Sequence, residues 1–497
     1  MYGDDKLNNH GILRYGLTLD YCETFSSLKY LDIELPLTLI RNFHIFIKPF
    51  VDNNLFNYNY INRLQEKYNI NTVGDVQKAL NHKQRQIKDL SKVPNRNIIL
   101  MPAALVKLAL DQFSDAPILL MVHNHYDKTA LKGKKLPGNL VKYSFGRDLV
   151  RVKIPRTDIV NLQTQLKQIF LSVKTHDVFG TLEFKQWFEV LLIRMVKNVY
   201  FLDRLIRRSN IGVILDHFEI TVPGNILSLL ALKYNLPFIY APQLLITDQS
   251  FIPTKASLYC AWGENYKQWM IKRGIEPTKI KITGNLRFEY AKNKIAISKK
   301  EFINLMNIPS DHFIITFTTQ QFEEKVNMEI MDWIEKFYYS IQNIPITFVI
   351  RPHPSDHTDY TPFLNISKIK LAPGQLDLFD TLKNSDFVMT VSSGTAIEAA
   401  ILRKGIIVLQ PTIPYHYDYN NDFHSHLVKA KAGLNVYKDK DLAKYLTKIV
   451  TDEDFRNSAI NQGQQFLNNT LELNYSPPVI IRQLIKNYLN QKDGSSD

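Results

Sequence analysis

The stretch Asp386-Phe-Val-Met-Thr-Val-Ser-Ser-Gly-Thr-Ala-Ile-Glu-Ala-Ala400 decides the fold class of this chain. Its first part, 387–391, is a short apolar run typical of a buried strand. Its second part, from about Thr395, has the small and apolar residues of a helix. A strand that passes directly into a helix is the repeating unit of a parallel sheet with helices on both faces. This stretch therefore predicts an α/β fold.

The same alternation continues in both directions along the chain. Around this stretch we expect strands at 313–317, 346–350, 369–371 and 406–409, with helices at 321–341, 376–384, 395–403, 440–450, 453–468 and 476–490. An earlier series has strands at 97–101, 117–123, 212–215, 237–240, 256–262 and 279–283, with helices at 103–113, 182–208 and 223–234. The sequence thus predicts two doubly wound, Rossmann-like halves in series.

Four parts follow from this division. Residues 1–95 form an N-terminal extension or subdomain, in which the apolar segment 36–48 is either a strand or a buried helix. Residues 96–290 form the first Rossmann-like domain, which would take the acceptor. Residues 300–475 form the second, which would take the nucleotide, and the polar, Lys-rich stretch 292–300 links the two. Residues 476–497 are a C-terminal helix and tail.

Composition narrows the classes of protein further. The chain has 497 residues, 45% hydrophobic and 22% charged, as expected for a folded globular protein. Its two cysteines exclude a disulfide scaffold or a cysteine-based zinc site, and indicate a reducing compartment. The N-terminus lacks the pattern of a signal peptide, and no apolar run approaches ~18 residues. We therefore expect a cytoplasmic protein without a membrane span.

The net charge of +13 admits three classes of partner: nucleic acid, an anionic membrane surface or a phosphorylated substrate. No run of five basic residues and no nucleic-acid-binding pattern is present, so we expect no nucleic acid partner. The helix expected at 184–208 carries basic residues beside apolar ones. It would either lie peripherally on an anionic membrane at the inner face of the cell membrane or pack on the sheet.

Two segments that follow strands are candidates for phosphate binding. At 392–398, the hydroxyls of Ser392, Ser393 and Thr395 precede a helix, Gly394 allows a ligand to come close, and Glu398 would accept from a ribose. The plainer interpretation is helix capping. In Arg351-Pro-His353-Pro, an extended backbone points Arg351 and His353 the same way, which suits an anionic ligand. The alternative is a rigid turn.

The first half offers a candidate general base. Asp216, His217 and Glu219 follow the strand at 212–215, and a carboxylate or imidazole there would accept a proton. Weaker candidates that would line the acceptor side are His123, His125, Gln243 and Arg287. The histidine-rich segments 415–417 and 424–426 lack carboxylates at ligand spacing, so we expect no metal and no cofactor.

Several motifs together resemble a known family. Pro237-Phe-Ile-Tyr-Ala-Pro-Gln243, Ala261-Trp-Gly263, Ile282-Thr-Gly-Asn-Leu-Arg-Phe288, Arg351-Pro-His-Pro354 and Ser392-Ser-Gly-Thr-Ala-Ile-Glu398 resemble bacterial surface-polysaccharide glycosyltransferases of the GT-B fold. The His-Pro and Ser-Ser pairs are similar to those of sialyltransferases and Kdo transferases, which use CMP-activated sugars. CDP-glycerol glycerophosphotransferases have a related pattern, and UDP-N-acetylglucosamine 2-epimerases share the fold.

The resemblance implies two domains that face a central cleft and a metal-independent transfer of a sugar. The donor would be a nucleotide sugar, with CMP-Kdo or CMP-sialic acid favoured, and the acceptor a glycan or lipid-linked molecule of capsule or lipopolysaccharide biosynthesis. His353, Ser392, Ser393 and Thr395 would contact the donor phosphate, Glu398 the ribose, and Asp216 would be the base. A CDP-glycerol or CDP-ribitol phosphotransferase and a nucleotide-sugar 2-epimerase remain alternatives.

Overall fold

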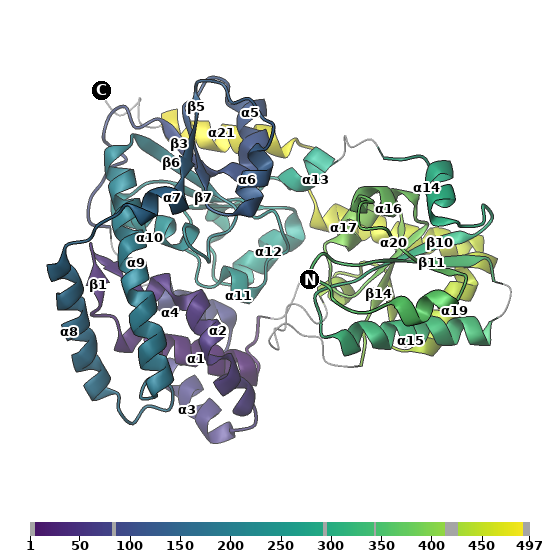
Figure 1. Cartoon of the computed structure of the whole chain (residues 1–497), viewed down its shortest axis with the longest axis horizontal. Coiled ribbons are helices and arrows are strands. Elements are labelled where there is room, and N and C mark those ends of the chain that lie inside the picture. The colour runs from purple at the N-terminus through teal and green to yellow at the C-terminus, as the bar shows by residue number, and fades with distance from the viewer. Residues whose placement is uncertain (1–4, 82–85, 292–295, 342–343, 413–425, 491–497) are drawn as a thin grey trace. The chain divides into compact units, whose positions relative to one another are not determined.

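The computed structural model describes residues 5–81, 86–291, 296–341, 344–412 and 426–490. The chain divides into two compact units, each built on one parallel sheet (Figure 1). The seven-stranded unit contains residues 5–261, 270–286 and 475–490. The six-stranded unit contains residues 262–269 and 287–474. The predicted α/β class, with two doubly wound sheets, is confirmed.

The seven-stranded sheet has the order β5-β4-β3-β6-β7-β8-β9, and every pair of neighbours is parallel. Its central strands are buried on both faces, which explains their continuous apolar runs. The strands are β3 (Ile98–Pro102), β4 (Ile118–Val122), β5 (Leu140–Ser144), β6 (Ile211–Asp216), β7 (Phe238–Tyr240), β8 (Leu258–Ala261) and β9 (Ile280–Ile282). Of these seven strands, only β5 was not predicted from the sequence, because it lies at the edge of the sheet and its residues Val141 and Lys142 are both exposed.

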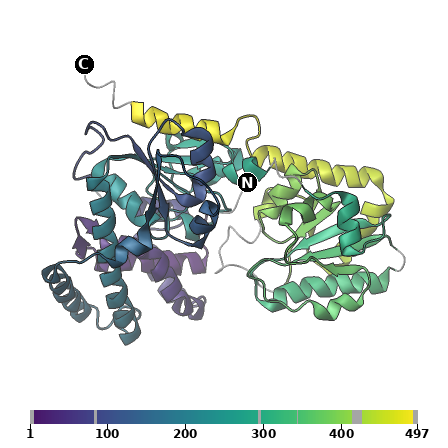
Figure 2. The same ribbon diagram turned by 45° about the horizontal axis from the view of Figure 1, so that its top comes forward.

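Helices cover this sheet: α5 (Val106–Gln112), α6 (His125–Leu131), α7 (Phe145–Val150), α8 (Arg156–Ser172), α9 (Leu182–Arg208), α10 (Gly224–Tyr234) and α11 (Asp248–Phe251). The chain then returns to the unit at its end, because α21 (Pro477–Asn490) contacts α5 and β6. Figure 2 shows this last helix, in yellow, along the seven-stranded unit.

Helix α9 settles the alternatives for segment 184–208. It begins and ends where the sequence predicted, and its apolar side chains Phe188, Leu192, Met195 and Leu202 are buried in the unit. Most of the apolar face therefore packs inside the seven-stranded unit, while Leu182, Val190 and Ile193 of the same helix are exposed. None of the helices in the described part of the chain is long and apolar enough to cross a membrane.

The N-terminal residues belong to the seven-stranded unit as a group of helices, α1 (Asn9–Thr24), α2 (Ile40–Asn53), α3 (Tyr58–Tyr68) and α4 (Val73–Asn81), with a two-stranded hairpin of β1 (Lys29–Tyr30) and β2 (Ile33–Glu34). The segment 36–48, predicted as a strand or a buried helix, is a 3-10 turn followed by α2. Aromatic rings join these helices to α9, as when Tyr21 stacks on Phe43 at 4.3 Å and meets Phe188 edge-on.

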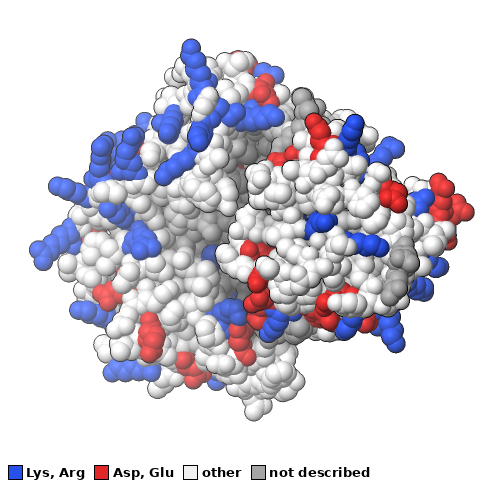
Figure 3. Space-filling model, turned by 45° about the vertical axis from the view of Figure 1, so that its right-hand side comes forward, with Lys and Arg blue, Asp and Glu red and all other residues white. Residues whose placement is uncertain are grey.

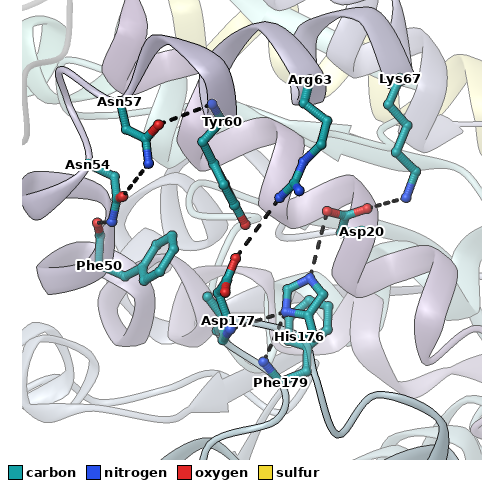
Figure 4. Close-up of polar contacts among 11 residues, drawn as sticks. Asp20, Phe50, Asn54, Asn57, Tyr60, Arg63, Lys67, His176, Asp177 and Phe179 are labelled. Atoms are coloured by element: carbon teal, nitrogen blue, oxygen red, sulfur yellow. Dashed lines mark hydrogen bonds and ion pairs between the residues drawn. The ribbon is translucent and has the colours of Figure 1, made fainter.

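A polar network reinforces the contact between these helices and the loop before α9 (Figure 4). Asp20 of α1 accepts hydrogen bonds from Lys67 at 2.5 Å and from Tyr68. The Nε2 atom of His176 lies 3.9 Å from Oδ2 of Asp20, while its Nδ1 atom accepts a hydrogen bond from the backbone N–H of Phe179. Although burial opposes it, hydrogen bonds from His176, Lys67 and Tyr68 hold the pKa of Asp20 below its usual value. The network is structural in character.

The six-stranded sheet has the order β12-β11-β10-β13-β14-β15 and is also parallel. Its strands are β10 (Phe313–Thr318), β11 (Ile346–Arg351), β12 (Ile369–Leu371), β13 (Phe387–Thr390), β14 (Gly405–Leu409) and β15 (Leu434–Val436). Helices α14 (Lys299–Met306), α15 (Glu324–Ser340), α16 (Leu378–Asn384), α17 (Thr395–Ile401), α19 (Asp439–Thr451) and α20 (Glu453–Thr470) complete it, and α12 (Glu264–Lys272) and α13 (Leu286–Ala291) lie where the chain passes between the units.

Candidate functional site

Each sheet has one topological switch point, and these two places are where ligands bind in open α/β sheets. In the seven-stranded unit, β3 leads to β4 on one side and β6 continues on the other, so the crevice lies beyond the carboxyl ends of β3 and β6. In the six-stranded unit, β10 leads to β11 on one side and β13 follows on the other.

A cavity of about 290 Å³ occupies the switch point of the seven-stranded unit. Its walls come from the ends of β3, β4 and β6 and from the loop that leads to α10. Much of the wall is apolar: Leu100, Met101, Met121, Leu215, Leu227 and Leu244 line it. Its polar wall is formed by His123, Asn124, Asp216, His217 and Thr221. Three residues predicted from the sequence therefore meet in one cavity.

Asp216 is the last residue of β6 and is only 5% exposed. Its Oδ1 atom accepts hydrogen bonds from the backbone N–H of His217 at 2.7 Å and of Phe218 at 3.0 Å. Burial raises the pKa of Asp216. A Cβ atom on Gly224 would lie 2.6 Å from the carbonyl oxygen of Phe218 and 2.9 Å from Oδ2 of Asp216, so this close turn requires glycine.

Two histidines accompany this carboxylate in the cavity wall. The Nδ1 atom of His217 lies 3.9 Å from Oδ1 of Asp216, and it is a buried atom with no hydrogen-bond partner among the described residues. His123 follows β4, and burial lowers its pKa below the usual value, which favours a neutral ring near pH 7. A carboxylate flanked by imidazoles in a largely apolar cavity can accept a proton from a bound hydroxyl.

Asp127 holds the rim of the cavity, although the sequence analysis did not select it. This buried residue of α6 accepts hydrogen bonds from the backbone N–H groups of Ala104, His123 and Asn124 at 2.9, 2.9 and 3.2 Å. It thereby ties the loop after β3 to the loop after β4. His125, which was predicted to line the acceptor side, does not line the cavity and instead lies against the ring of Tyr126, 3.8 Å away.

Two other predicted residues make structural contacts outside this cavity. Glu219 is 4% exposed, and its Oε1 atom accepts from the backbone N–H of Lys255 at 2.7 Å while Oε2 accepts from the hydroxyl of Thr254. Burial raises the pKa of Glu219 to about 7. Gln243 donates from its side chain to the carbonyl of Ala241 at 2.7 Å. Neither residue is among those that line the cavity.

At the switch point of the six-stranded unit, the hydroxyls of Ser392 and Thr395 are directed inward. Both residues are buried. Gln320, just beyond β10, accepts from the backbone N–H of Ser392 at 2.8 Å and donates to its hydroxyl at 3.1 Å. The hydroxyls of Thr395 and Thr318 lie 2.8 Å apart. These contacts join the ends of β10 and β13, so both hydroxyls already have hydrogen-bond partners within the protein.

Ser393, Gly394, Arg351 and His353 are the predicted residues that remain partly or fully exposed at this edge. The Nδ1 atom of His353 accepts from the backbone N–H of Ser355 at 3.1 Å, which leaves Nε2 as the donor. Burial lowers the pKa of His353 and of Arg351 below their usual values. Because β10 lies between β11 and β13, these residues flank the crevice on its two sides.

Glu398 does not cap its helix. The N-cap residue of α17 is Gly394, which makes no side-chain capping hydrogen bond, and Glu398 instead accepts from Arg287 at 2.9 Å. Both residues belong to the six-stranded unit. Arg287, predicted for the acceptor side, is therefore the ion-pair partner of the carboxylate that was predicted to hold a ribose.

The described residues contain no group of three or more His, Cys, Asp or Glu side chains placed to hold a metal ion. The predicted histidine-rich segments lie outside the described residues, except for His426. Cys22 and Cys260 are both buried, and no disulfide joins them.

Sequence reasoning missed the residues at the end of β10 and just beyond it, namely Thr318, Thr319 and Gln320. Thr319 accepts from the backbone N–H of His353 at 2.9 Å and donates to Asp356, so it joins the ends of β10 and β11. The signal was present, because Thr318-Thr-Gln-Gln321 follows the strand predicted at 313–317. Only the strand order shows that this polar stretch lies between the two candidate segments.

Two Rossmann-like units in one chain define the class: this is a GT-B fold. One of the solved structures that the chain resembles, with a TM-score of 0.50, supports this fold. A complex of Staphylococcus aureus MnaA with UDP is 16% identical, with a TM-score of 0.50, over 79% of this chain and 97% of that chain. The Neisseria meningitidis UDP-GlcNAc 2-epimerase bound to UDP-GlcNAc is 15% identical, with a TM-score of 0.48, over 78% of this chain and 99% of that chain. A variant of the wall teichoic acid polymerase TagF is 12% identical, with a TM-score of 0.46, over 84% of this chain and 94% of that chain.

Residues 250–414, about a third of the chain, match the family model described as UDP-N-acetylglucosamine 2-epimerase. The matched part begins within α11 and ends beyond β14, and so includes the segment that follows β13. No curated protein sequence matches the chain.

Proposed function

We propose that this protein is a metal-independent glycosyltransferase that moves a sugar from a nucleotide-activated donor to a hydroxyl of an acceptor. The observation that carries the proposal is the cavity at the β3/β6 switch point, where the buried carboxylate of Asp216 meets His217 and His123. A base of this kind is what an acceptor hydroxyl requires. The raised pKa of Asp216 makes its carboxylate a stronger base than an exposed aspartate.

The donor nucleotide is assigned to the switch point of the six-stranded unit. Arg351 and His353 supply donors on one side of the crevice, and the backbone at Ser393 and Gly394 supplies the other side. In the reaction, the acceptor oxygen bonds to the anomeric carbon while the bond from that carbon to the phosphate oxygen breaks. The nucleotide leaves with the electron pair, the acceptor proton passes to Asp216, and Arg351 and His353 offset the charge on the leaving phosphate.

For the donor we propose a uridine nucleotide ahead of the cytidine nucleotide that the motifs suggested. The support is the match of residues 250–414 to the UDP-N-acetylglucosamine 2-epimerase model and the UDP in the MnaA complex. A thermal-shift comparison of UDP, CDP and CMP tests this choice. UDP should raise the melting temperature most, and the increase should be lost in Arg351→Ala. A larger effect of CMP would return the preference to CMP-sugars.

Turnover tests the base. Asp216→Asn keeps the oxygen that accepts from the two backbone groups but removes the base, so the transfer rate should fall by about 10²–10⁴-fold. Asp111→Asn, an exposed aspartate of α5 in the same unit, is the matched control and should leave the rate unchanged. Mass spectrometry of the product establishes whether a glycosyl or a phosphoryl-alcohol group has moved. Full activity of Asp216→Asn would refute the assignment.

A nucleotide-sugar 2-epimerase is the second candidate, and the family match at residues 250–414 favours it. The two activities differ in one requirement, since an epimerase converts the nucleotide sugar without an acceptor. Incubation of the protein with UDP-N-acetylglucosamine alone, followed by NMR of the sugar, separates them. Appearance of the C2 epimer would establish the epimerase, whereas a transferase leaves the donor intact or releases UDP slowly.

A further inference from the structure

The positive charge of the chain is concentrated in one part of the sequence. Residues 128–208 contain seventeen basic and six acidic residues, a net +11 of the total +13. Within them, residues 128–156 contain nine basic residues and one acidic residue, a net +8. The basic residues are interrupted by others, so no run of five exists and the concentration is not visible as a motif.

These nine basic residues lie on one continuous stretch of the seven-stranded unit, from the second turn of α6 through the edge strand β5 and helix α7 to the first residue of α8. We call this stretch, residues 128–156, the basic surface. All nine side chains are exposed: Lys128, Lys132, Lys134, Lys135, Lys142, Arg147, Arg151, Lys153 and Arg156. Figure 3 shows blue side chains gathered over the upper left of the molecule, where the seven-stranded unit lies, with few red ones among them.

Very little of this charge is neutralised within the protein. Among the described residues, Arg147 alone of the nine pairs with a carboxylate, that of its neighbour Asp148 at 3.5 Å. Elsewhere the chain pairs many of its exposed lysines, as with Lys48 and Asp52 or Lys336 and Asp332. Eight unpaired cations in 29 residues repel each other, so the surface gains most when an external anion binds.

Exposed apolar side chains lie among these cations. Val150 at the end of α7 is 76% exposed, Val141 of β5 is 55% exposed, and Tyr126 of α6 is 68% exposed. Tyr126 also lines the cavity that contains Asp216. Lysines and arginines interspersed with apolar and aromatic side chains are suited to the interface of an anionic bilayer, where cations meet headgroups and apolar groups enter the acyl boundary.

We propose that the basic surface binds an anionic lipid bilayer. The exposed valines favour a bilayer over a nucleic acid or a soluble polyanion, which would offer them no apolar environment. Because α6 supplies both the start of the basic surface and a wall of the cavity, binding would hold the cavity beside the lipid headgroups. This inference goes beyond the proposed function, since a surface can bind lipid whatever reaction the cavity serves.

Flotation of the full chain with vesicles tests the proposal. Vesicles of phosphatidylcholine with about 30% phosphatidylglycerol should carry the protein at 0.1 M salt, whereas pure phosphatidylcholine should not, and binding should weaken as salt rises. The variant Lys132→Glu/Lys134→Glu/Lys135→Glu should lose at least about tenfold in partition coefficient, given the contribution expected per lysine. Val150→Ser should lose binding more modestly, without altering the salt dependence.

The matched control is Lys438→Glu/Lys440→Glu/Lys444→Glu, which makes the same change of charge at exposed positions of the six-stranded unit. It should float within about twofold of wild type. Equal losses in both variants would show that net charge alone is responsible and would overturn the proposal, as would binding to RNA or heparin without flotation. The melting-temperature response to UDP should be unchanged in the Lys132 variant, which separates failure here from failure of the proposed function.

Discussion

The replacement of Glu219 by glutamine should make the protein more stable at neutral and alkaline pH than the wild type. Glu219 is fully enclosed, and burial raises its pKa from the usual 4.5 to about 7. Between these two values the folded protein holds one more proton than the unfolded chain. The free energy of unfolding therefore falls by about 1.4 kcal/mol for each pH unit in that interval, about 3 kcal/mol in all.

The contacts of Glu219 explain why glutamine is the right replacement. Its oxygen can still accept from the backbone N–H of Lys255, and its amide can donate to the hydroxyl of Thr254, as a protonated carboxyl would. The variant should thus keep at pH 8 the stability that the wild type has only below about pH 4.5. The Asp216 cavity should be unaffected, because Glu219 does not line it.

Urea unfolding followed by circular dichroism at several values between pH 5 and pH 8.5 measures the difference. The stability advantage of Glu219→Gln should grow with pH and level off above pH 7.5. Glu66→Gln, an exposed carboxylate of α3 in the same unit, should show no such growth. If the wild type and Glu219→Gln differ by the same amount at every pH, the raised pKa is wrong and the reasoning fails.

Three further changes test the packing at the start of β6 and the architecture of the two switch points. Gly212→Ala places a Cβ atom 2.0 Å from the carbonyl oxygen of Arg96, which is backbone and cannot move aside, so unfolding in urea should show a loss of about 3 kcal/mol or more. Gln320→Ala leaves the buried N–H of Ser392 without its acceptor and should cost about 1–3 kcal/mol in the same assay, together with weaker UDP binding. Asp127→Asn removes the charge that attracts three backbone N–H groups at the cavity rim; turnover should fall while the thermal shift with UDP persists.

The sequence predicted the strands and helices well because most of them are buried. Strand β6 is apolar along its whole length, and α9 alternates apolar and charged residues at helical spacing, so local pattern and burial agree. The elements that were not predicted, among them β5, β15, α6, α7, α8 and α14, have mostly exposed or partly exposed residues. In β5, Val141 and Lys142 are both exposed, and its remaining residues do not form an apolar run that distinguishes a strand from a loop.

Whether a candidate residue lines a cavity or contacts other parts of the protein also depends on its tertiary surroundings. Asp216 and His217 were selected because they follow a strand, and they do line a cavity. Ser392 and Thr395 were selected on the same ground, but the partners of their hydroxyls are Gln320 and Thr318, more than seventy residues earlier in the chain. No local pattern could show that these hydroxyls are already satisfied, because the contact exists only once β10 and β13 are paired.

By itself, the sequence determined the class of fold, most of the strands of the two sheets, and the strand ends at which chemistry could occur. These properties follow from the apolar pattern and from turn residues, which act over a few positions. Tertiary structure decided which strands are neighbours, and so where each switch point lies. It also decided which polar groups remain for a ligand, because hydrogen bonding and burial depend on partners that are distant in sequence.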